Sequence, residues 1–231
     1  MLISIRFILF FVCGIGLMGC PSAENSQTTQ SMASSPNPPA NADNPKALIV
    51  YLSRTKNTEA LAKMVQEKVG GDLVALELQT PYPENYQAIV RQVDQENQDG
   101  YLPLLKTRIE TFGQYDAIFV GFPTWDMQLP PPIKSFLNQY EADLNGKMIV
   151  PFNNNSGYGM GQSLAQFNQY CRGCQIMQSI ELRGGIERDG ILFVMEGERA
   201  NQAKNTIAQW LQDLSVNNPV IQQLLKNHAT N

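Results

Sequence analysis

Hydroxyl, amide and cationic side chains are concentrated in "SRTKNT", residues 53–58, between two apolar segments. The preceding run, residues 47–52, is typical of a strand buried on both faces. Apolar residues at helical spacing follow, so the polar stretch lies where a strand ends and a helix begins. The N–H groups of a helix N-terminus lack intrahelical partners and can bind a phosphate there. The hydroxyls of Ser53, Thr55 and Thr58 could add donors.

The same stretch has a simpler interpretation, in which one of its polar side chains caps the helix and binds no ligand. Two further loops favour a ligand. "GFPTWDMQLP", residues 121–130, places Trp125 on a loop, where it could stack on a ring or merely pack on its neighbours. "NNNSGYGMG", residues 153–161, is rich in glycine and amides, so its backbone could approach a flat polar ligand closely. Together the three loops describe a site for a planar, phosphorylated cofactor.

Other chemistries have little support in the sequence. Neither G-x-x-x-x-G-K-[ST] nor a G-x-G-x-x-G after the first strand is present, which disfavours kinase, GTPase and dinucleotide-binding functions. The single histidine, His228, stands near the C-terminus, so catalysis by histidine and a histidine metal site are unexpected. No nucleophile–base pair or metal cluster points to hydrolysis, and we expect no metal.

Strand and helix patterns alternate along the chain, which predicts an α/β fold with a parallel sheet covered on both faces. Such a sheet binds ligands at the carboxyl ends of its strands, where the three loops would meet. Residues 183–197 fit the alternation poorly, and "ILFVME", residues 191–196, could be an added edge strand or a hairpin arm. The expected strands are residues 47–52, 72–78, 115–121, 146–152 and 175–182, and the expected helices include 84–98, 129–140, 162–170 and 198–214.

The N-terminal residues 1–20 have the layout of a signal peptide, with one arginine before an apolar run from Phe7 to Met18. The run ends in "LMGC", which resembles the bacterial lipobox, in which the chain is cut before the cysteine and the cysteine carries lipid. We therefore predict a lipoprotein signal peptide and a lipid on Cys20. An ordinary signal peptide and an uncleaved anchor are the alternatives. Residues 21–45 are almost devoid of apolar residues, which predicts a disordered linker.

Cysteine usage fits an exported protein. Cys13 would leave with the signal peptide and Cys20 would take lipid, so Cys171 and Cys174 in "CRGC" remain as an even pair suited to an oxidising compartment. A redox-active C-x-x-C normally opens a helix after a strand. Here the motif follows a helical stretch and precedes a strand, so a structural disulfide is favoured over a redox dithiol.

Length and charge limit the remaining possibilities. The chain has 231 residues, enough for one sizeable core, which we place at residues 46–215, with residues 216–231 as a C-terminal tail. There are 17 Lys and Arg against 21 Asp and Glu, for a net charge of −4. Because basic residues neither dominate nor cluster, we expect no nucleic-acid partner.

With these features the chain resembles the flavodoxins, in which the first loop reads S-R-T-G-N-T. Four segments carry the resemblance in family order: "YLSRTKNTEALA", "YDAIFVGFPTW", "PPPIKSFL" and "VPFNNNSGYGMGQSL". It extends over about residues 46–214 and implies the flavodoxin-like fold, a three-layer, doubly wound sheet of five parallel strands in the order 2-1-3-4-5. It also implies non-covalently bound FMN.

The resemblance assigns cofactor binding to three groups of residues. The first loop would hold the phosphate, the second would flank the isoalloxazine ring, and the third would line the pyrimidine side of that ring. These groups are Ser53, Arg54, Thr55, Lys56, Asn57 and Thr58, then Pro123, Thr124, Trp125 and Asp126, and finally Asn155, Ser156, Gly157, Tyr158 and Gly159.

The sequence departs from the family pattern at three of these positions. Lys56 stands where the family usually has glycine, so a positive φ there would strain the backbone, while the added cation could attract a phosphate. Asp126 replaces a frequent second aromatic residue, and Tyr158 replaces a small one. A net negative domain with Asp126 near the ring is expected to disfavour the anionic reduced flavin and lower its potential.

These features together predict an exported, membrane-tethered, FMN-binding electron-transfer protein of the bacterial cell envelope, with its domain in the periplasm. Its redox partner, another protein or a quinone, is unknown. One alternative is an FMN-dependent enzyme that takes hydride from a nicotinamide and reduces a quinone-type acceptor. The other is a flavodoxin-fold binding module that has lost flavin.

Overall fold

The structure is a computed structural model that describes residues 44–229. The predicted signal peptide, residues 1–20 with the predicted lipid site Cys20, and most of the predicted linker, residues 21–45, lie outside the described residues. Within the described part of the chain, no helix is both long enough and apolar enough to cross a membrane.

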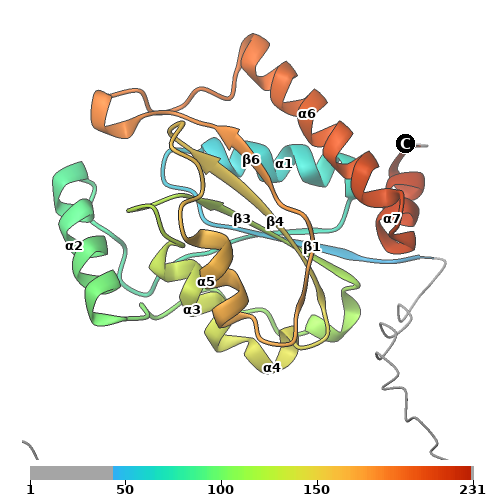
Figure 1. The fold of residues 1–231 in the computed structure, drawn as a ribbon, viewed down its shortest axis with the longest axis horizontal. Coiled ribbons are helices and arrows are strands. Elements are labelled where there is room, and N and C mark those ends of the chain that lie inside the picture. The colour runs from blue at the N-terminus through green and yellow to red at the C-terminus, as the bar shows by residue number, and fades with distance from the viewer. Residues whose placement is uncertain (1–43, 230–231) are drawn as a thin grey trace, which may run out of the picture. The chain divides into compact units, whose positions relative to one another are not determined.

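Five parallel strands form the central sheet in the order β2-β1-β3-β4-β5, which confirms the predicted fold class and strand order (Figure 1). A sixth strand, β6, also pairs with β4, in parallel orientation. The strands are β1 (Ala47–Tyr51), β2 (Asp72–Ala75), β3 (Ala117–Pro123), β4 (Met148–Asn155), β5 (Gln175–Ile176) and β6 (Ile180–Arg183).

The single strand expected over residues 175–182 is divided into β5 and β6. β5 pairs with the start of β4 and β6 pairs with its end, on either side of Pro151. The carbonyl of Ile149 accepts from Met177 N, and that of Asn155 accepts from Gly184 N. Along a strand, the backbone groups of every second residue point to the same neighbouring strand. Pro151 therefore faces the edge strand, as Ile149 and Asn155 do, but it has no N–H to donate. The proline therefore accounts for the interruption of the edge strand.

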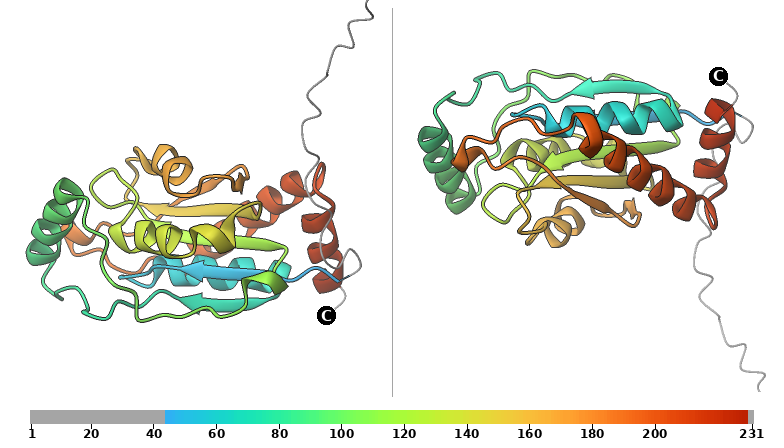
Figure 2. Two further views of the ribbon diagram at one scale, coloured as in Figure 1. Left: turned by 90° about the horizontal axis from the view of Figure 1, so that it is seen from below. Right: turned by 90° about the horizontal axis from the view of Figure 1, so that it is seen from above.

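Helices cover both faces of the sheet, as Figure 2 shows with the sheet seen edge-on. One face packs on α1, α6 and α7 through the side chains of Ile49, Phe119 and Val150. The other packs on α3 and α5 through side chains such as Val50 and Ile118. The helices are α1 (Asn57–Val69), α2 (Tyr86–Asp99), α3 (Pro131–Gln139), α4 (Glu141–Leu144), α5 (Ser163–Tyr170), α6 (Gly197–Ser215) and α7 (Pro219–Ala229), with short 3-10 turns η1 (Phe112–Gln114) and η2 (Glu187–Asp189).

Helix α2 differs from the others because it stands beyond the end of the sheet in both figures. Only Ile89, Val93 and Glu96 are buried along it. Its N-terminus is capped by Asn85, whose side chain accepts from Ala88 N at 3.0 Å. The helix is therefore well defined locally while contributing little to either core.

The segment 191–196, considered from the sequence as an edge strand or hairpin arm, forms neither. Its only pairing is an isolated bridge between Ile186 and Ile191. The side chain of Asn57 instead donates to Leu192 O at 2.6 Å and accepts from Val194 N at 3.0 Å. Those are backbone groups that strand pairing would use, so the segment is fixed to the start of α1.

Residues 216–231, set apart from the sequence as a tail, contain α7, which belongs to the core in the structure. Val220, Ile221 and Leu224 are buried in the same cluster as α1 and α6. Near the end of the helix, a Cβ added at Gly70 would lie 1.9 Å from His228 Nε2, so the glycine gives the histidine room to pack. Its apolar residues Val220, Ile221, Leu224 and Leu225 recur at helical spacing, but the sequence does not indicate what covers them.

The two cysteines of "CRGC" are joined by a disulfide, with Cα atoms 5.5 Å apart, directly after α5. Cys171 is buried. The turn is also held by the backbone, because Gly173 O accepts from Gly146 N at 2.9 Å. The bridge thus closes a turn at the end of the sheet where β5 begins.

We predict that α7 contributes to the stability of the whole domain. Ile221→Ala should lower the free energy of unfolding by about 2–5 kcal/mol, because it leaves a cavity among fully buried side chains. Urea unfolding followed by circular dichroism measures the change. Val216→Ala is the control, since Val216 is 76% exposed and should shift stability by no more than about 0.5 kcal/mol. Equal effects of the two substitutions would contradict an integral α7.

Candidate functional site

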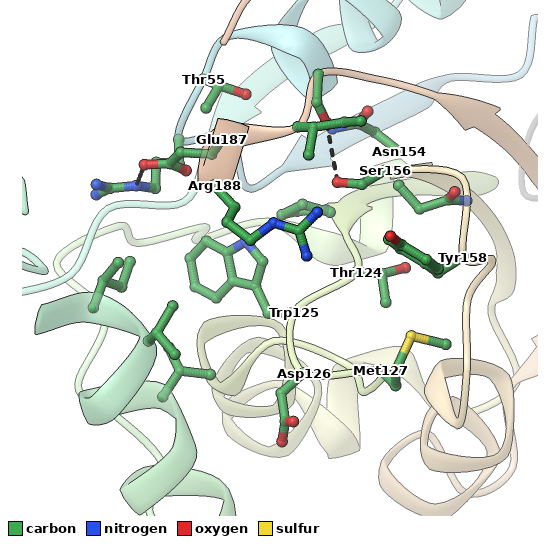
Figure 3. A pocket seen from close by; sticks show the side chains of 18 of the residues that line it. Thr55, Thr124, Trp125, Asp126, Met127, Asn154, Ser156, Tyr158, Glu187 and Arg188 are labelled. Atoms are coloured by element: carbon green, nitrogen blue, oxygen red, sulfur yellow. Dashed lines mark hydrogen bonds and ion pairs between the residues drawn. The ribbon is translucent and has the colours of Figure 1, made fainter. Parts of the chain in front are cut away.

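A cavity of about 350 Å³ opens at the carboxyl ends of the strands. Its walls come from the loops after β1, β3 and β4, from α2, and from the turn after β6, and Figure 3 shows how their side chains face one another. The predicted residues among its lining are Arg54, Thr55, Thr58, Pro123, Thr124, Trp125, Asp126, Asn155, Ser156, Tyr158 and Gly159. Ser53, Lys56, Asn57 and Gly157 belong to the same loops but are not among the lining residues.

The first loop delivers the N-terminus of α1 to the cavity. Lys56, the residue before the helix, has φ 64° and ψ 0°, so the family's glycine position does require a left-handed backbone here. Within residues 44–229, the Lys56 side chain makes no capping bond to the first turn of α1. The positive end of a 13-residue helix is therefore presented beside Thr55 and Thr58, which line the cavity.

Two buried side-chain oxygens near this helix end have no hydrogen-bond partner among the described residues. They are Ser53 Oγ in the first loop and Asn154 Oδ1 at the end of β4. Asn154 lines the cavity, and its Nδ2 lies 3.5 Å from Thr58 Oγ1. A buried polar atom without a partner costs about 1–3 kcal/mol. Asn154 Oδ1 lies against Gly184, where an added Cβ would approach it to 1.7 Å, and Ser53 is not among the lining residues.

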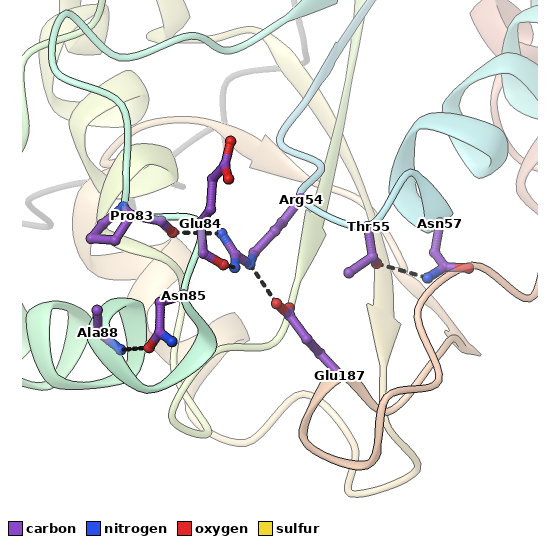
Figure 4. Close-up of polar contacts among 8 residues, drawn as sticks. All are labelled: Arg54, Thr55, Asn57, Pro83, Glu84, Asn85, Ala88 and Glu187. Atoms are coloured by element: carbon purple, nitrogen blue, oxygen red, sulfur yellow. Dashed lines mark hydrogen bonds and ion pairs between the residues drawn. The ribbon is translucent and has the colours of Figure 1, made fainter.

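Asn57 has a structural role that the sequence did not indicate. Its Nδ2 donates to Thr55 Oγ1 at 2.8 Å and to Leu192 O, and its Oδ1 accepts from Val194 N. Figure 4 shows the bond within the first loop. Because both amide hydrogens and the oxygen are bonded within the protein, the Asn57 side chain positions the loop.

Arg54 connects three segments that are distant in sequence (Figure 4). Its Nε donates to Glu187 Oε1 at 2.7 Å, its Nη1 to Pro83 O at 2.9 Å and its Nη2 to Glu84 O at 2.5 Å. The side chains of Arg54 and Glu187 are only 19% and 21% exposed. The guanidinium fork thus attaches α2 and the turn after β6 to the first loop.

The second loop is a tight turn that carries Trp125 into the cavity. Gln128 N donates to Trp125 O at 2.9 Å across the turn. The two central residues, Asp126 and Met127, both have positive φ, 50° and 52°, as in a type I′ turn. Non-glycine residues are strained in this conformation. The Asp126 carboxylate offsets part of the strain by accepting from Gln128 Nε2 at 2.9 Å and from Asn97 Nδ2 at 3.2 Å.

Trp125 is held in place by a second aromatic side chain. The edge of its ring system meets Tyr82 in a T-shaped contact, with centroids 5.6 Å apart and an angle of 81° between the planes. The Tyr82 hydroxyl donates to Glu96 on α2. Burial, and the hydrogen bond to Glu96, raise the pKa of the Tyr82 hydroxyl far above its ordinary value. The hydroxyl therefore stays protonated, and the tyrosine links Trp125 to α2.

A ladder of side-chain amides fixes the third loop. Asn153 Nδ2 donates to Phe122 O at 3.0 Å, and Asn155 Nδ2 donates to Asn153 Oδ1 at 3.0 Å. Asn155 Oδ1 in turn accepts from Gly157 N at 2.8 Å and from Gly159 N at 3.3 Å. These two glycines have φ of 99° and 81°. The ladder holds the tight loop in which Tyr158 stands, 67% exposed, at the rim of the cavity.

Two walls of the cavity were not foreseen from the sequence. One is the face of α2 that presents apolar side chains, and its helical spacing was visible although its location was not. The other is the turn after β6, which had no periodic pattern. The lining residues added by the structure are Tyr86, Ile89, Val90, Val93, Asp94, Met127, Asn154, Gly185, Ile186, Glu187 and Arg188.

A doubly wound sheet with a polar cavity at the carboxyl ends of its strands defines an open α/β protein that binds ligands where the strand order reverses. The family model described as flavodoxin matches residues 46–197, more than half of the chain. The chain therefore belongs to the flavodoxin family.

Individual relatives support this membership at lower similarity. A flavodoxin of Synechocystis is 26% identical over 106 residues, which cover 45% of this chain and 48% of the relative, so the match spans about half of that protein. A flavoprotein structure from Bacteroides eggerthii has a TM-score of 0.59 at 24% identity, over 74% of this chain and 99% of that one. A flavoprotein of Lactobacillus acidophilus, solved in complex with FMN, has a TM-score of 0.54 at 20% identity, over 64% and 99% of the two chains. These structures share the fold.

We predict that Lys56 destabilises the domain through its backbone conformation. Lys56→Gly should raise the free energy of unfolding by about 1 kcal/mol relative to Lys56→Ala, because only glycine adopts a positive φ without steric cost. Both variants lose the same charge, so Lys56→Ala is the matched control. Chemical denaturation of the two proteins side by side measures the difference. Identical unfolding midpoints would show that the left-handed conformation carries no strain.

Proposed function

We propose that the protein binds FMN in this cavity and transfers electrons. The observation that carries the proposal is the meeting of three features at one edge of the sheet: the N-terminus of α1 beside Thr55 and Thr58, the aromatic side chains of Trp125 and Tyr158, and the third loop with its amide-fixed backbone. Each suits a different part of a planar phosphorylated cofactor. The FMN bound to the related Lactobacillus acidophilus flavoprotein supports the choice of ligand.

The residues present fit FMN by their chemistry. Thr55 and Thr58 with the first N–H groups of α1 would hold the phosphate, and Asn154, which lines the cavity, would face the ribityl chain. Trp125 and Tyr158 would flank the ring, and the amide-fixed third loop would offer backbone N–H and C=O groups to its pyrimidine edge. FMN supplies one- and two-electron transfer when bound. The protein binds and orients the ring and limits the access of water to it.

The functional test is a titration of the purified full chain with FMN, followed by quenching of flavin fluorescence. We expect saturable quenching in the wild type. Trp125→Ala should weaken binding about tenfold or more, since aromatic stacking on a planar base contributes about 1–3 kcal/mol. Tyr101→Ala is the control, because Tyr101 is 54% exposed and does not line the cavity. No quenching by the wild type would leave a flavodoxin fold used as a flavin-free binding module.

We further propose that the protein is an exported lipoprotein of the bacterial envelope, tethered by lipid on Cys20 and by the segment 21–45, with its domain in the periplasm. The sequence "LMGC" and the short apolar run before it support this location. The redox partner would then be an envelope protein or a membrane quinone.

Metabolic labelling with a radioactive fatty acid tests the anchor. The wild type should incorporate label and shorten by the length of the signal peptide, whereas Cys20→Ser should remain unlabelled because it removes the lipid acceptor. Cys13→Ser is the matched control and should be labelled normally, since Cys13 lies within the segment that is removed. Label on the Cys20→Ser protein would exclude Cys20 as the anchor.

A further inference from the structure

A turn outside the expected site carries an arginine to the rim of the cavity. The 3-10 turn Glu187–Asp189 is closed by bonds from Asp189 N to Ile186 O and from Gly190 N to Glu187 O, both at 3.0 Å. Gly190 ends the turn with φ 77°. Arg188 is the central residue of this turn, and it lines the cavity together with Glu187.

The turn is attached to two of the site loops, so the position from which Arg188 projects is fixed. Glu187 is paired with Arg54 in the first loop at 2.7 Å. Ser156 Oγ in the third loop donates to Gly185 O at 3.0 Å. Further along the chain, Asn57 binds the backbone of residues 192 and 194. The loops that form the proposed FMN site therefore also hold the arginine.

The Arg188 side chain lies at the rim of the space that Trp125, Thr124 and Tyr158 surround, and it is 60% exposed (Figure 3). Its Nε donates to Asp189 Oδ1 at 2.8 Å and its Nη2 lies 3.4 Å from Asp189 Oδ2. Hydrogen bonds to Asp189 and Tyr158 raise the pKa of the guanidinium. An arginine carries its charge at every physiological pH.

The other charged groups of the lining are engaged elsewhere or face water. Glu187 is paired with Arg54, and the Asp126 carboxylate is bound by Gln128 and Asn97. Asp94 is exposed on α2. Among the described lining residues, Arg54 and Arg188 are the cations, and Arg54 is used in holding the loops together. Arg188 is thus the cation adjacent to the aromatic walls.

We propose that Arg188 stabilises the anionic, two-electron-reduced form of the flavin and so raises its midpoint potential. The inference rests on the proposed FMN site and extends it. Reduction of the neutral oxidised ring takes two electrons from an external reductant and one proton from solvent, and it leaves one negative charge on the ring. A cation beside the ring favours this charged form. The effect is opposite to the one expected from the net acidic charge and Asp126.

The test measures midpoint potentials of the FMN-loaded full chain by stepwise reduction with dithionite. Arg188→Gln should bind oxidised FMN as the wild type does, but its affinity for the reduced flavin should fall about tenfold. For a two-electron couple a tenfold change equals about 30 mV, so the potential should drop by that amount. The midpoint potential of Arg188→Lys should lie between those of the wild type and Arg188→Gln, because lysine keeps the charge but lacks the planar fork of arginine.

Two further variants separate the local effect from net charge. Arg172→Gln removes one arginine from the exposed disulfide turn at the other end of the sheet and should leave the potential unchanged. Asp189→Asn removes the carboxylate that offsets Arg188 and should raise the potential.

The outcomes distinguish this inference from the proposal on which it rests. An unchanged potential in Arg188→Gln would overturn it, and so would an equal loss of affinity for oxidised and reduced FMN, which would make Arg188 a general binding residue. A drop of the same size in Arg172→Gln would also overturn it by showing an effect of net charge. Absence of FMN binding by the wild type, seen in the titration itself, would overturn the proposed function and the inference together.

Discussion

The three-way contact of Arg54 is the interaction on which the shape of the site depends. The carboxyl ends of β1, β3 and β4 bring three loops together through the sheet itself, but α2 and the turn after β6 have no place in the sheet. Arg54 joins both to the first loop through Glu187 and the carbonyls of Pro83 and Glu84. Charge-assisted bonds to one rigid fork are stronger and more directional than bonds between neutral groups. One side chain therefore contacts two of the cavity walls and joins both to the first loop.

The same turn depends on an interruption of the sheet. Pro151 has no N–H on the side of β4 that faces the edge strand, so that strand pairs in two short pieces. The second piece, β6, follows β4 to its end at Asn155 and Arg183. The chain thus leaves the sheet beside the third loop and turns over the cavity. There Ser156 bonds to Gly185 of the turn, and Arg54 pairs with Glu187 of the turn. The missing N–H of Pro151 thus explains why the edge strand is divided and why its second piece ends beside the turn that contains Arg188.

The sequence was sufficient for the sheet and the three loops, because these depend on local signals: apolar runs, helical spacing and a polar stretch after a strand. The strand order was predicted from the resemblance to flavodoxins. The sequence was insufficient for α2 as a cavity wall, since the pattern of an amphipathic helix shows which face is apolar and not what covers that face. It also did not indicate the structural contacts of Arg54 and Asn57, two of the residues predicted to bind the cofactor. Their partners lie 133 and 137 residues away at Glu187 and Val194, and no periodicity links such positions.

The hydrogen bonds of three consecutive asparagines at the end of β4 show which of them fix the loops of the site. The side-chain amides of Asn153 and Asn155 form hydrogen bonds with the second and third loops. These bonds fix Thr124 and Tyr158 in the absence of a ligand. Asn154, between them in sequence, keeps a buried oxygen without a partner among the described residues. Because successive side chains of a strand point to opposite faces, only the middle asparagine turns toward α1, where Thr58 and the helix N-terminus lie. The three consecutive asparagines therefore divide into two that shape the loops and one that faces α1, because side chains alternate along the strand.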